Sequence, residues 1–222
     1  GITVIVGEAG TGKTTLVRKA LQSSTGEATV VHLSNPTLTR AEFYEYLVGG
    51  FGFASEAGKS KIHFLRELEA HLDDESRPRL ALVVDEAQSV PYELLEEIRL
   101  LTNAESGTGR SIAVALVGQP ELARRLDEVR LRQLKQRVVL RCALTPLSLK
   151  DTAAYITGRV KTAGGEAMRL FTRDAVIAIH KHSKGIPRVI SVICDNALVN
   201  GFAADQKPVG ASIVGEVCRG LA

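Results

Sequence analysis

The sequence lacks any apolar run that approaches the ~18 residues needed for a membrane-spanning helix. It also lacks the charged n-region and apolar h-region of a secretory signal peptide. Cysteine is scarce, and Cys142, Cys194 and Cys218 have no metal-ligand spacing. His180 and His182 are two residues apart on an expected helix, so they face different sides and do not predict a metal site. Few and scattered thiols are typical of the reducing cytoplasm.

Charge of one sign is not in large excess either, because 28 basic residues face 25 acidic ones and the net charge is +3. This balance is too mild to indicate nucleic-acid binding by itself. The basic residues nevertheless gather in one stretch, where only Asp127 and Glu128 oppose them: Arg124, Arg125, Arg130, Arg132, Lys135, Arg137 and Arg141. The stretch is either a solvated helix face or a binding surface. The sequence starts at Gly1 and enters a strand at once, so we expect a piece of a longer protein.

The most informative motif is a glycine-rich loop near the start, which fits the phosphate-loop pattern G-x-x-x-x-G-K-[ST] at every position. An apolar run precedes it and a helical pattern follows it, which places bound phosphates at a helix N-terminus. Glycines let successive backbone N–H groups curl around the phosphates. Lys13 is predicted to reach the β- and γ-phosphates, and the Thr14 hydroxyl to bind Mg²⁺. The predicted nucleotide-binding loop comprises Gly7, Glu8, Ala9, Gly10, Thr11, Gly12, Lys13, Thr14 and Thr15.

Apolar β-runs alternate with helical patterns up to about residue 146, which predicts a parallel sheet with helices on both faces. The five expected strands lie near residues 2–6, 28–33, 80–84, 112–117 and 138–140. We expect a helix over 39–48 that breaks at Gly49–Gly52, and a loop over Asn103–Arg110. From Ser148 onward only helices are expected, near 149–163, 173–183, 187–202 and 209–219. The predicted domains are residues 1–146, an α/β core, and 147–222, a small helical domain.

An acidic pair, Asp85 and Glu86, ends the third expected strand. Ligands of open parallel sheets bind beyond the carboxyl ends of the strands, so Asp85 is expected beside the phosphate loop. A carboxylate there can hold Mg²⁺ through its water shell. Glu86 adds a second carboxylate that can orient or deprotonate an attacking water. The alternative is that Asp85 merely caps a helix.

Taken together, these motifs resemble the AAA+ ATPases, specifically the branch of general secretion pathway protein A, the MSHA-pilus ATPases and the exosortase-associated ATPases. Transposition helper ATPases are similar at a greater distance. Besides the phosphate loop, the resemblance rests on four segments: Val84–Gln88, Leu116–Leu122, Leu131–Val138 and Gly185–Arg188. It implies a P-loop NTPase core with five strands and a small C-terminal all-helical lid domain. It also implies ATP and ADP as ligands and Mg²⁺ as the metal.

The resemblance further implies roles for three residues outside the loop and the acidic pair. Gln119 is expected between Asp85 and the phosphate loop, to hold the attacking water or sense the γ-phosphate. Arg188 is expected to touch the γ-phosphate from the lid, although it could simply be a solvated arginine. Arg137 is expected as an arginine finger that points into a neighbouring subunit, with Arg132 as its competitor.

The adenine contacts are the least defined part of this interpretation. Pro146, Ile156 and Ile186, with Leu147, are candidate apolar contacts of the base, and Arg188 is a further candidate contact of the nucleotide. ATP rather than GTP rests on the resemblance.

Three functions follow as alternatives. The first is an oligomeric ATPase, a ring or filament, that switches or remodels a protein partner in envelope secretion, pilus or exopolysaccharide biogenesis. It would be cytoplasmic, or peripheral to the inner membrane through segments outside this sequence. The second is a DNA-binding transposition regulator, with Arg124, Arg125 or Arg130 on DNA. The third is a small-molecule kinase, which Glu86 beside Asp85 and the helical appendage disfavour.

Overall fold

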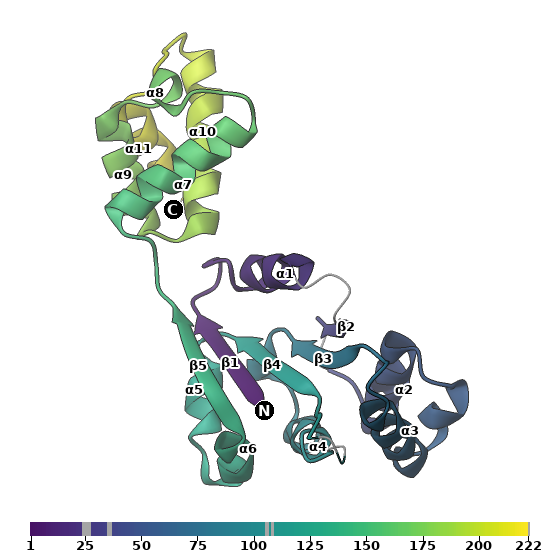
Figure 1. Cartoon of the computed structure of the whole chain (residues 1–222). Coiled ribbons are helices and arrows are strands. Elements are labelled where there is room, and N and C mark those ends of the chain that lie inside the picture. Colours follow the sequence, from purple (N-terminus) through teal and green to yellow (C-terminus); the bar gives the residue numbers. More distant parts are fainter. Residues whose placement is uncertain (24–27, 35–36, 105–106, 108, 222) are drawn as a thin grey trace. The chain divides into compact units, whose positions relative to one another are not determined.

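The structure is a computed structural model of the chain, and it describes residues 1–23, 28–34, 37–104, 107 and 109–221. The chain forms two compact units (Figure 1). One unit comprises Gly1–Gly7 and Lys13–Leu144, and the other comprises Glu8–Gly12 and Thr145–Ala222. The loop expected over Asn103–Arg110 includes residues 105, 106 and 108, which lie outside the described residues.

The first unit is built on a five-stranded sheet in the order β2-β3-β4-β1-β5. Every neighbouring pair of strands runs parallel. The strands are β1 Ile2–Gly7, β2 Ala28–Leu33, β3 Arg79–Val84, β4 Ala113–Gly118 and β5 Val138–Leu144. The predicted five-stranded parallel sheet is therefore confirmed.

Helices follow the strands in the alternating order that parallel strands require. The α-helices of this unit are α1 Lys13–Ser23, α2 Arg40–Phe51, α3 Lys61–Asp73, α4 Tyr92–Leu101, α5 Pro120–Leu126 and α6 Arg132–Gln136. Three short 3₁₀ segments accompany them, namely η1 Ser55–Lys59, η2 Ala87–Ser89 and η3 Val129–Leu131.

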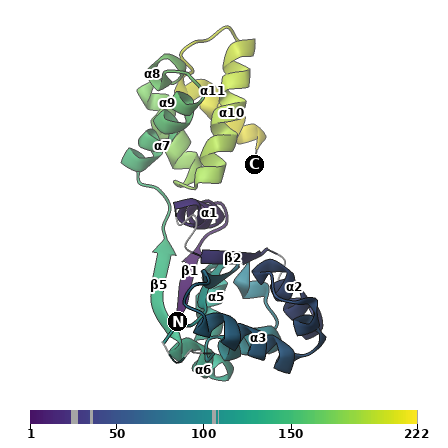
Figure 2. The same ribbon diagram turned by 45° about the vertical axis from the view of Figure 1, so that its right-hand side comes forward.

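The two faces of the sheet are buried by different helices, because side chains alternate along each strand. Val114 and Leu116 of β4 belong to the large core that also takes in residues of α2 to α6. Val117 of β4 and Val83 of β3 point the other way, where they pack with Val17 of α1. Figures 1 and 2 show α1 on one side of the sheet and α2 to α6 on the other.

The second unit is helical, as expected, with one isolated β-bridge between Phe171 and Val209 among its described residues. Its helices are α7 Leu149–Thr162, α8 Ala167–Leu170, α9 Arg173–Ser183, α10 Pro187–Ala203 and α11 Ala211–Gly220. They share one apolar core, to which Ile156, Ile190 and Val214 contribute. Within the described part of the chain, no helix combines the length and the apolarity needed to cross a bilayer.

Two local predictions are corrected by the structure. The helix expected to break at Gly49 continues to Phe51 and ends at Gly52, which adopts the left-handed conformation at φ 70°. Gly50 serves packing instead, because a Cβ there would lie 2.4 Å from a Val31 methyl. The fifth strand is longer than expected and reaches Leu144. Its side chains are mostly exposed at the sheet edge, so it has no buried apolar pattern to reveal it.

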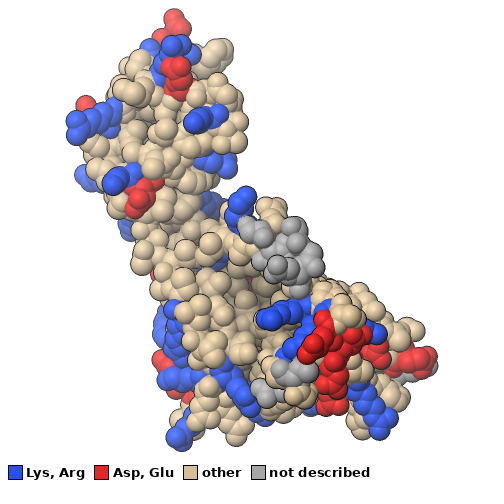
Figure 3. All heavy atoms as spheres, viewed as in Figure 1, with Lys and Arg blue, Asp and Glu red and all other residues tan. Residues whose placement is uncertain are grey.

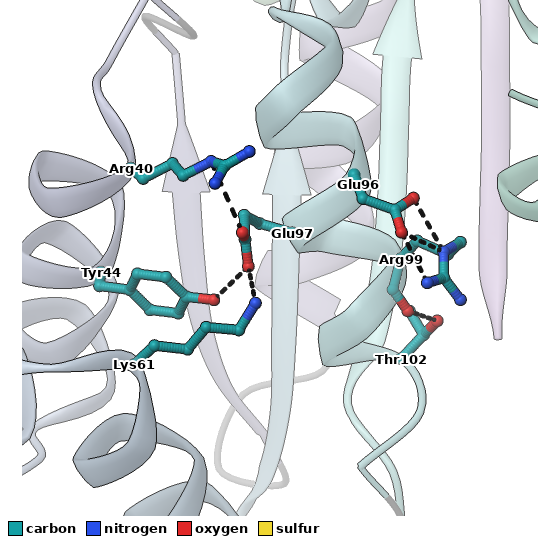
Figure 4. Close-up of polar contacts among 7 residues, drawn as sticks. All are labelled: Arg40, Tyr44, Lys61, Glu96, Glu97, Arg99 and Thr102. Carbon is teal, nitrogen blue, oxygen red and sulfur yellow. Dashed lines mark hydrogen bonds and ion pairs between the residues drawn. The ribbon is translucent and has the colours of Figure 1, made fainter. Parts of the chain in front are cut away.

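A buried carboxylate fastens α2 and α3 to α4 (Figure 4). Glu97 of α4 is 5% exposed and accepts hydrogen bonds from Tyr44 Oη at 2.6 Å and Lys61 Nζ at 2.5 Å. Arg40 Nε lies 3.6 Å from its other oxygen. Burial alone would raise the pKa of the Glu97 carboxyl, but the bonds from Lys61 and Tyr44 outweigh it and hold that pKa below its usual value. The same burial and hydrogen bond raise the pKa of Tyr44.

We expect Glu97→Gln to lower the free energy of unfolding by about 1–3 kcal/mol, because it leaves buried donors without their charged acceptor. Glu96→Gln is the matched control on the same helix, since the Glu96 side chain is 49% exposed and its loss from the ion pair with Arg99 should change stability by less than about 1 kcal/mol. Urea denaturation of both variants measures the difference. Equal losses in the two variants would show that the buried network stabilises nothing beyond a surface pair.

The same variant has an expected pH dependence. Since the pKa of Glu97 is depressed, its contribution is complete above the usual glutamate pKa and is lost as the pH falls through the depressed value. The stability gap between wild type and Glu97→Gln should therefore shrink on acidification.

Candidate active site

Three neighbouring strands bring the predicted site residues to one edge of the sheet. β1, β4 and β3 lie side by side and run parallel, so their carboxyl ends meet. The phosphate loop follows β1, Asp85 and Glu86 follow β3, and Gln119 follows β4. The expected convergence of the acidic pair and Gln119 thus follows from strand order.

The phosphate loop has the backbone that its glycines predict. Gly10 and Gly12 adopt φ 81° and 95°, which side-chain-bearing residues rarely do. Lys13 begins α1 and is 6% exposed, and its Nζ donates to the Gly7 carbonyl at 2.8 Å. Thr11 Oγ1 donates to the Glu8 carbonyl at 2.8 Å and closes the turn. Three further predicted loop residues are exposed, namely Glu8, Ala9 and Thr15.

The two predicted magnesium residues are in direct contact. Thr14 Oγ1 donates to Asp85 Oδ2 at 2.6 Å, although the residues lie on different elements. Asp85 is 6% exposed, and its other oxygen accepts the Glu86 backbone N–H at 2.9 Å. The Asp85 backbone N–H donates to the Leu33 carbonyl of β2 at 2.9 Å. The hydrogen bonding between β2 and β3 therefore continues to the residue that carries the carboxylate. A hydroxyl and a carboxylate side by side are ligand types that Mg²⁺ takes.

Glu86 lies in a cluster of two glutamines. Its Oε2 accepts from Gln88 Nε2 at 2.6 Å and from Gln119 Nε2 at 3.4 Å. Gln119 precedes α5 as its N-cap, and its backbone N–H donates to Gln88 Oε1 at 3.0 Å. Glu86 itself is exposed, with a left-handed backbone at φ 50°. A carboxylate open to solvent beside an amide can orient a water, as the sequence predicts.

The basic stretch separates into paired and unpaired side chains. Five of its members contact other groups of the chain, namely Arg124, Arg125, Arg130, Lys135 and Arg141. Arg132 and Arg137 are exposed, and among the described residues neither has a hydrogen bond or ion pair from its guanidinium. Arg137 caps α6 just before β5, with its carbonyl held by Ile2 N–H at 2.9 Å. Figure 3 shows Lys and Arg spread along the side of this unit where α5, α6 and β5 lie.

The remaining predicted residues belong to the helical unit. Pro146 is exposed and Ile186 half-buried, whereas Ile156 is 3% exposed and serves that unit's core. Arg188 opens α10 with an exposed side chain, and its backbone N–H donates to the Gly10 carbonyl of the same unit at 3.2 Å. Position 185 requires glycine, because a Cβ atom there would lie 2.1 Å from the Leu147 carbonyl oxygen. The nucleotide contacts of these residues stay predictions.

Residues 1–126 match a protein-family model described as AAA domain. The chain belongs to the AAA domain family. The expected resemblance is confirmed for the secretion branch as well: general secretion pathway protein A of Aeromonas hydrophila is 38% identical over 211 residues. The match covers 91% of this chain but 37% of that relative, so the chain spans little more than a third of the relative's length.

Solved structures share the fold of this AAA domain. The ORC2 protein of Aeropyrum pernix in its ADP form has a TM-score of 0.69 and 16% identity, and the match covers 98% of this chain and 62% of that one. Cdc6p of Pyrobaculum aerophilum has a TM-score of 0.69 and 18% identity, with 94% and 57% covered. The RuvB Holliday junction branch migration motor of Thermotoga maritima has a TM-score of 0.60 and 16% identity, with 98% and 60% covered. At such identities the likeness shows the fold alone.

An AAA domain is a P-loop nucleoside-triphosphatase domain, and the residues present here fit its nucleotide and metal. The loop glycines adopt the conformation that frees backbone N–H groups, Lys13 supplies a cation, and Thr14 with Asp85 supplies oxygen ligands. Bound Mg²⁺ would supply charge neutralisation at the phosphates.

Sequence reasoning missed the contacts of three residues of this AAA domain. Gln88 lies inside a quoted motif and bonds to Glu86 two residues away, but its oxygen accepts from Gln119, which follows β4. Arg125 was considered only as part of a charge run and as a candidate DNA contact, yet its Nη2 donates to the Val90 carbonyl at 3.0 Å and its Nη1 to the Gln88 carbonyl. The His32 Nε2 atom lies 3.9 Å from Asp85 Oδ2. This nitrogen is buried and has no hydrogen-bond partner among the described residues. None of these three relations has a local sequence signal.

Proposed function

We propose that this AAA domain binds ATP with Mg²⁺ and hydrolyses it. The observation that carries the proposal is the 2.6 Å hydrogen bond between Thr14 and Asp85, because it joins the two proposed metal ligands next to Glu86 in the chain. In this function Lys13 binds the β- and γ-phosphates, Glu86 is the general base, and Gln119 holds the attacking water. Arg188 contacts the γ-phosphate and so couples the nucleotide state to the helical unit. The direct test is magnesium-dependent release of phosphate from ATP by the purified chain, with GTP as the comparison.

We propose further that the complete site forms between copies of the chain. Arg137 is exposed and unpaired in the described structure, while most of its basic neighbours are engaged within their own chain. A free guanidinium is suited to stabilise charge on a phosphoryl group in the next subunit. Head-to-tail contacts of this kind generate rings or filaments.

Mixing two inactive variants tests this assembly. Arg137→Ala keeps Glu86, and Glu86→Gln keeps Arg137, so a site is complete wherever the first variant's Glu86 meets the second variant's Arg137. In a random equimolar mixture about a quarter of head-to-tail interfaces have this composition. We expect hydrolysis of the mixture to rise towards that fraction of wild-type turnover, and wild-type turnover per subunit to rise with protein concentration.

Arg124→Ala is the control, because Arg124 already pairs with Glu121 at 2.8 Å on the surface. It should hydrolyse ATP like the wild type. Absence of rescue in the mixture, together with turnover that does not depend on concentration, contradicts a role of Arg137 in trans. If Arg132→Ala mixed with Glu86→Gln restored hydrolysis and Arg137→Ala did not, the arginine finger would be Arg132.

We propose that the ATPase is cytoplasmic and switches a protein of envelope secretion, pilus or exopolysaccharide biogenesis, and the similarity to general secretion pathway protein A supports the first of these. DNA binding is disfavoured because the three arginines considered for it are engaged within the chain. Arg124 pairs with Glu121 at 2.8 Å. Arg125 holds backbone carbonyls, and Arg130 lies 4.2 Å from the Tyr92 ring and pairs with Glu93. Stimulation of ATP turnover by duplex DNA would reverse this preference and favour a transposition regulator.

A further inference from the structure

The backbone at Glu86 is held in a conformation that needs support. Glu86 adopts φ 50° and ψ 38°, in the left-handed region that costs a side-chain-bearing residue roughly 1–2 kcal/mol. The 3₁₀ segment η2 begins at the next residue. Left-handed conformations persist only where surrounding contacts determine them, and such sites cluster around function.

The Glu86 backbone is held by its own N–H, which donates to Asp85 Oδ1 at 2.9 Å, and by its carbonyl, which accepts the Ser89 N–H at 2.8 Å. Gln88 holds the Glu86 side chain and uses both ends of its own side chain to do so. Its Nε2 donates to Glu86 Oε2 at 2.6 Å, and its Oε1 accepts the backbone N–H of Gln119 at 3.0 Å. The side chain therefore bridges the end of β3 to the end of β4. Gly118 leaves the room for this bridge, since a Cβ there would lie 2.6 Å from Gln88 Oε1.

Arg125 fixes the main chain beneath the bridge. From α5 its guanidinium donates to the carbonyl oxygens of Gln88 and Val90, on both sides of Ser89. The same guanidinium lies 4.7 Å from the centre of the Tyr92 ring. A guanidinium that bonds to two carbonyls and stacks on an aromatic ring has little conformational freedom. Arg125 therefore fixes the backbone from which the Gln88 side chain extends.

The carboxylate of Glu86 is consequently fixed through one oxygen. Oε2 takes both amide donors, from Gln88 and Gln119, whereas Oε1 has no donor among the described residues. A general base needs one oxygen free to accept the proton. It also needs a fixed position, because small displacements of a catalytic group cost up to ~10²-fold in rate.

From these contacts we infer that Gln88, supported by Arg125, is a positioning residue for Glu86. It acts through Glu86 and touches neither nucleotide nor metal. The inference rests on the proposed function, because positioning matters only if Glu86 is the base.

Gln88→Glu is the sharpest test, because it keeps the length of the side chain and an oxygen for the Gln119 N–H. It removes only the donor to Glu86 and places a like charge there. We expect kcat to fall at least about 10-fold, while the ATP affinity measured by calorimetry stays within about 2-fold of the wild type. Gln88→Leu, which removes both ends of the bridge, should fall at least as far. Arg124→Ala is the matched control for Arg125→Ala, and only the second should lower kcat.

Folding is checked on the nucleotide-free variants by their melting temperatures. Since Gln88 and Glu86 interact directly, the loss in Tm of Gln88→Leu combined with Glu86→Ala should be smaller than the sum of the single losses. A wild type that hydrolyses ATP and a Gln88→Glu variant with unchanged kcat would overturn the inference and leave the proposed function standing. A wild type that binds ATP and never hydrolyses it would overturn the proposed function first.

Discussion

Replacing Lys13 by alanine is expected to abolish nucleotide binding. Lys13 is 6% exposed as a residue and its Nζ lies 2.8 Å from the Gly7 carbonyl oxygen, so the ammonium is held at the start of the phosphate loop. Charge-assisted bonds to phosphate are among the strongest polar contacts in proteins, and no neighbouring loop residue can replace this cation. We expect ATP affinity to fall by at least about 100-fold in a calorimetric titration.

Arg18→Ala is the control for Lys13→Ala, because it removes an exposed cation from the same helix. It should bind ATP like the wild type. If Lys13→Ala kept its affinity while Arg18→Ala behaved normally, the glycine-rich loop would not be the phosphate site.

Glu86→Gln is expected to separate binding from hydrolysis. The substitution keeps the shape of the side chain and an oxygen that accepts from Gln88, but it removes the group that takes the proton. ATP affinity should stay near that of the wild type, whereas hydrolysis should fall about 10²-fold or more. Single-turnover phosphate release measures the chemical step without interference from product release.

Glu121→Gln is a suitable control, because Glu121 is a nearby carboxylate that only pairs with Arg124 on the surface. Normal turnover in Glu86→Gln would exclude Glu86 as the base. In that case the bonds from Gln88 and Gln119 would be structural, and the search for the base would turn to Asp85.

Signals that lie within a few residues of one another were readable from the sequence. The phosphate loop needs glycines at set intervals because its own backbone adopts positive φ at Gly10 and Gly12. The second strand was predicted with its observed bounds, Ala28–Leu33, because apolar residues on both of its faces pack, Val31 and Leu33 in the large core and Val30 on the α1 side. The place of Asp85 beside Thr14 followed from a general property of parallel sheets, in which ligands gather at the carboxyl ends of strands.

Relations between distant segments were decided by the tertiary structure. Gly50 looked like a helix breaker, but Val31 packs against it, and that contact appears only when α2 lies on β2. Glu97 was not singled out from the sequence, and its buried network exists because α2 and α3 bring Tyr44 and Lys61 to it.

The same distinction between local signals and contacts of distant segments applies to the candidate active site. The sequence by itself singled out the residues that we propose to carry the chemistry, Lys13, Thr14, Asp85 and Glu86, because each belongs to a short motif whose backbone geometry is local. Only the tertiary structure decided what anchors Gln88 beside Glu86, because the other end of the Gln88 side chain reaches Gln119 through the adjacency of β3 and β4. Hydrogen bonds between side chains depend on distances of a few tenths of an ångström, and strand order and packing set those distances.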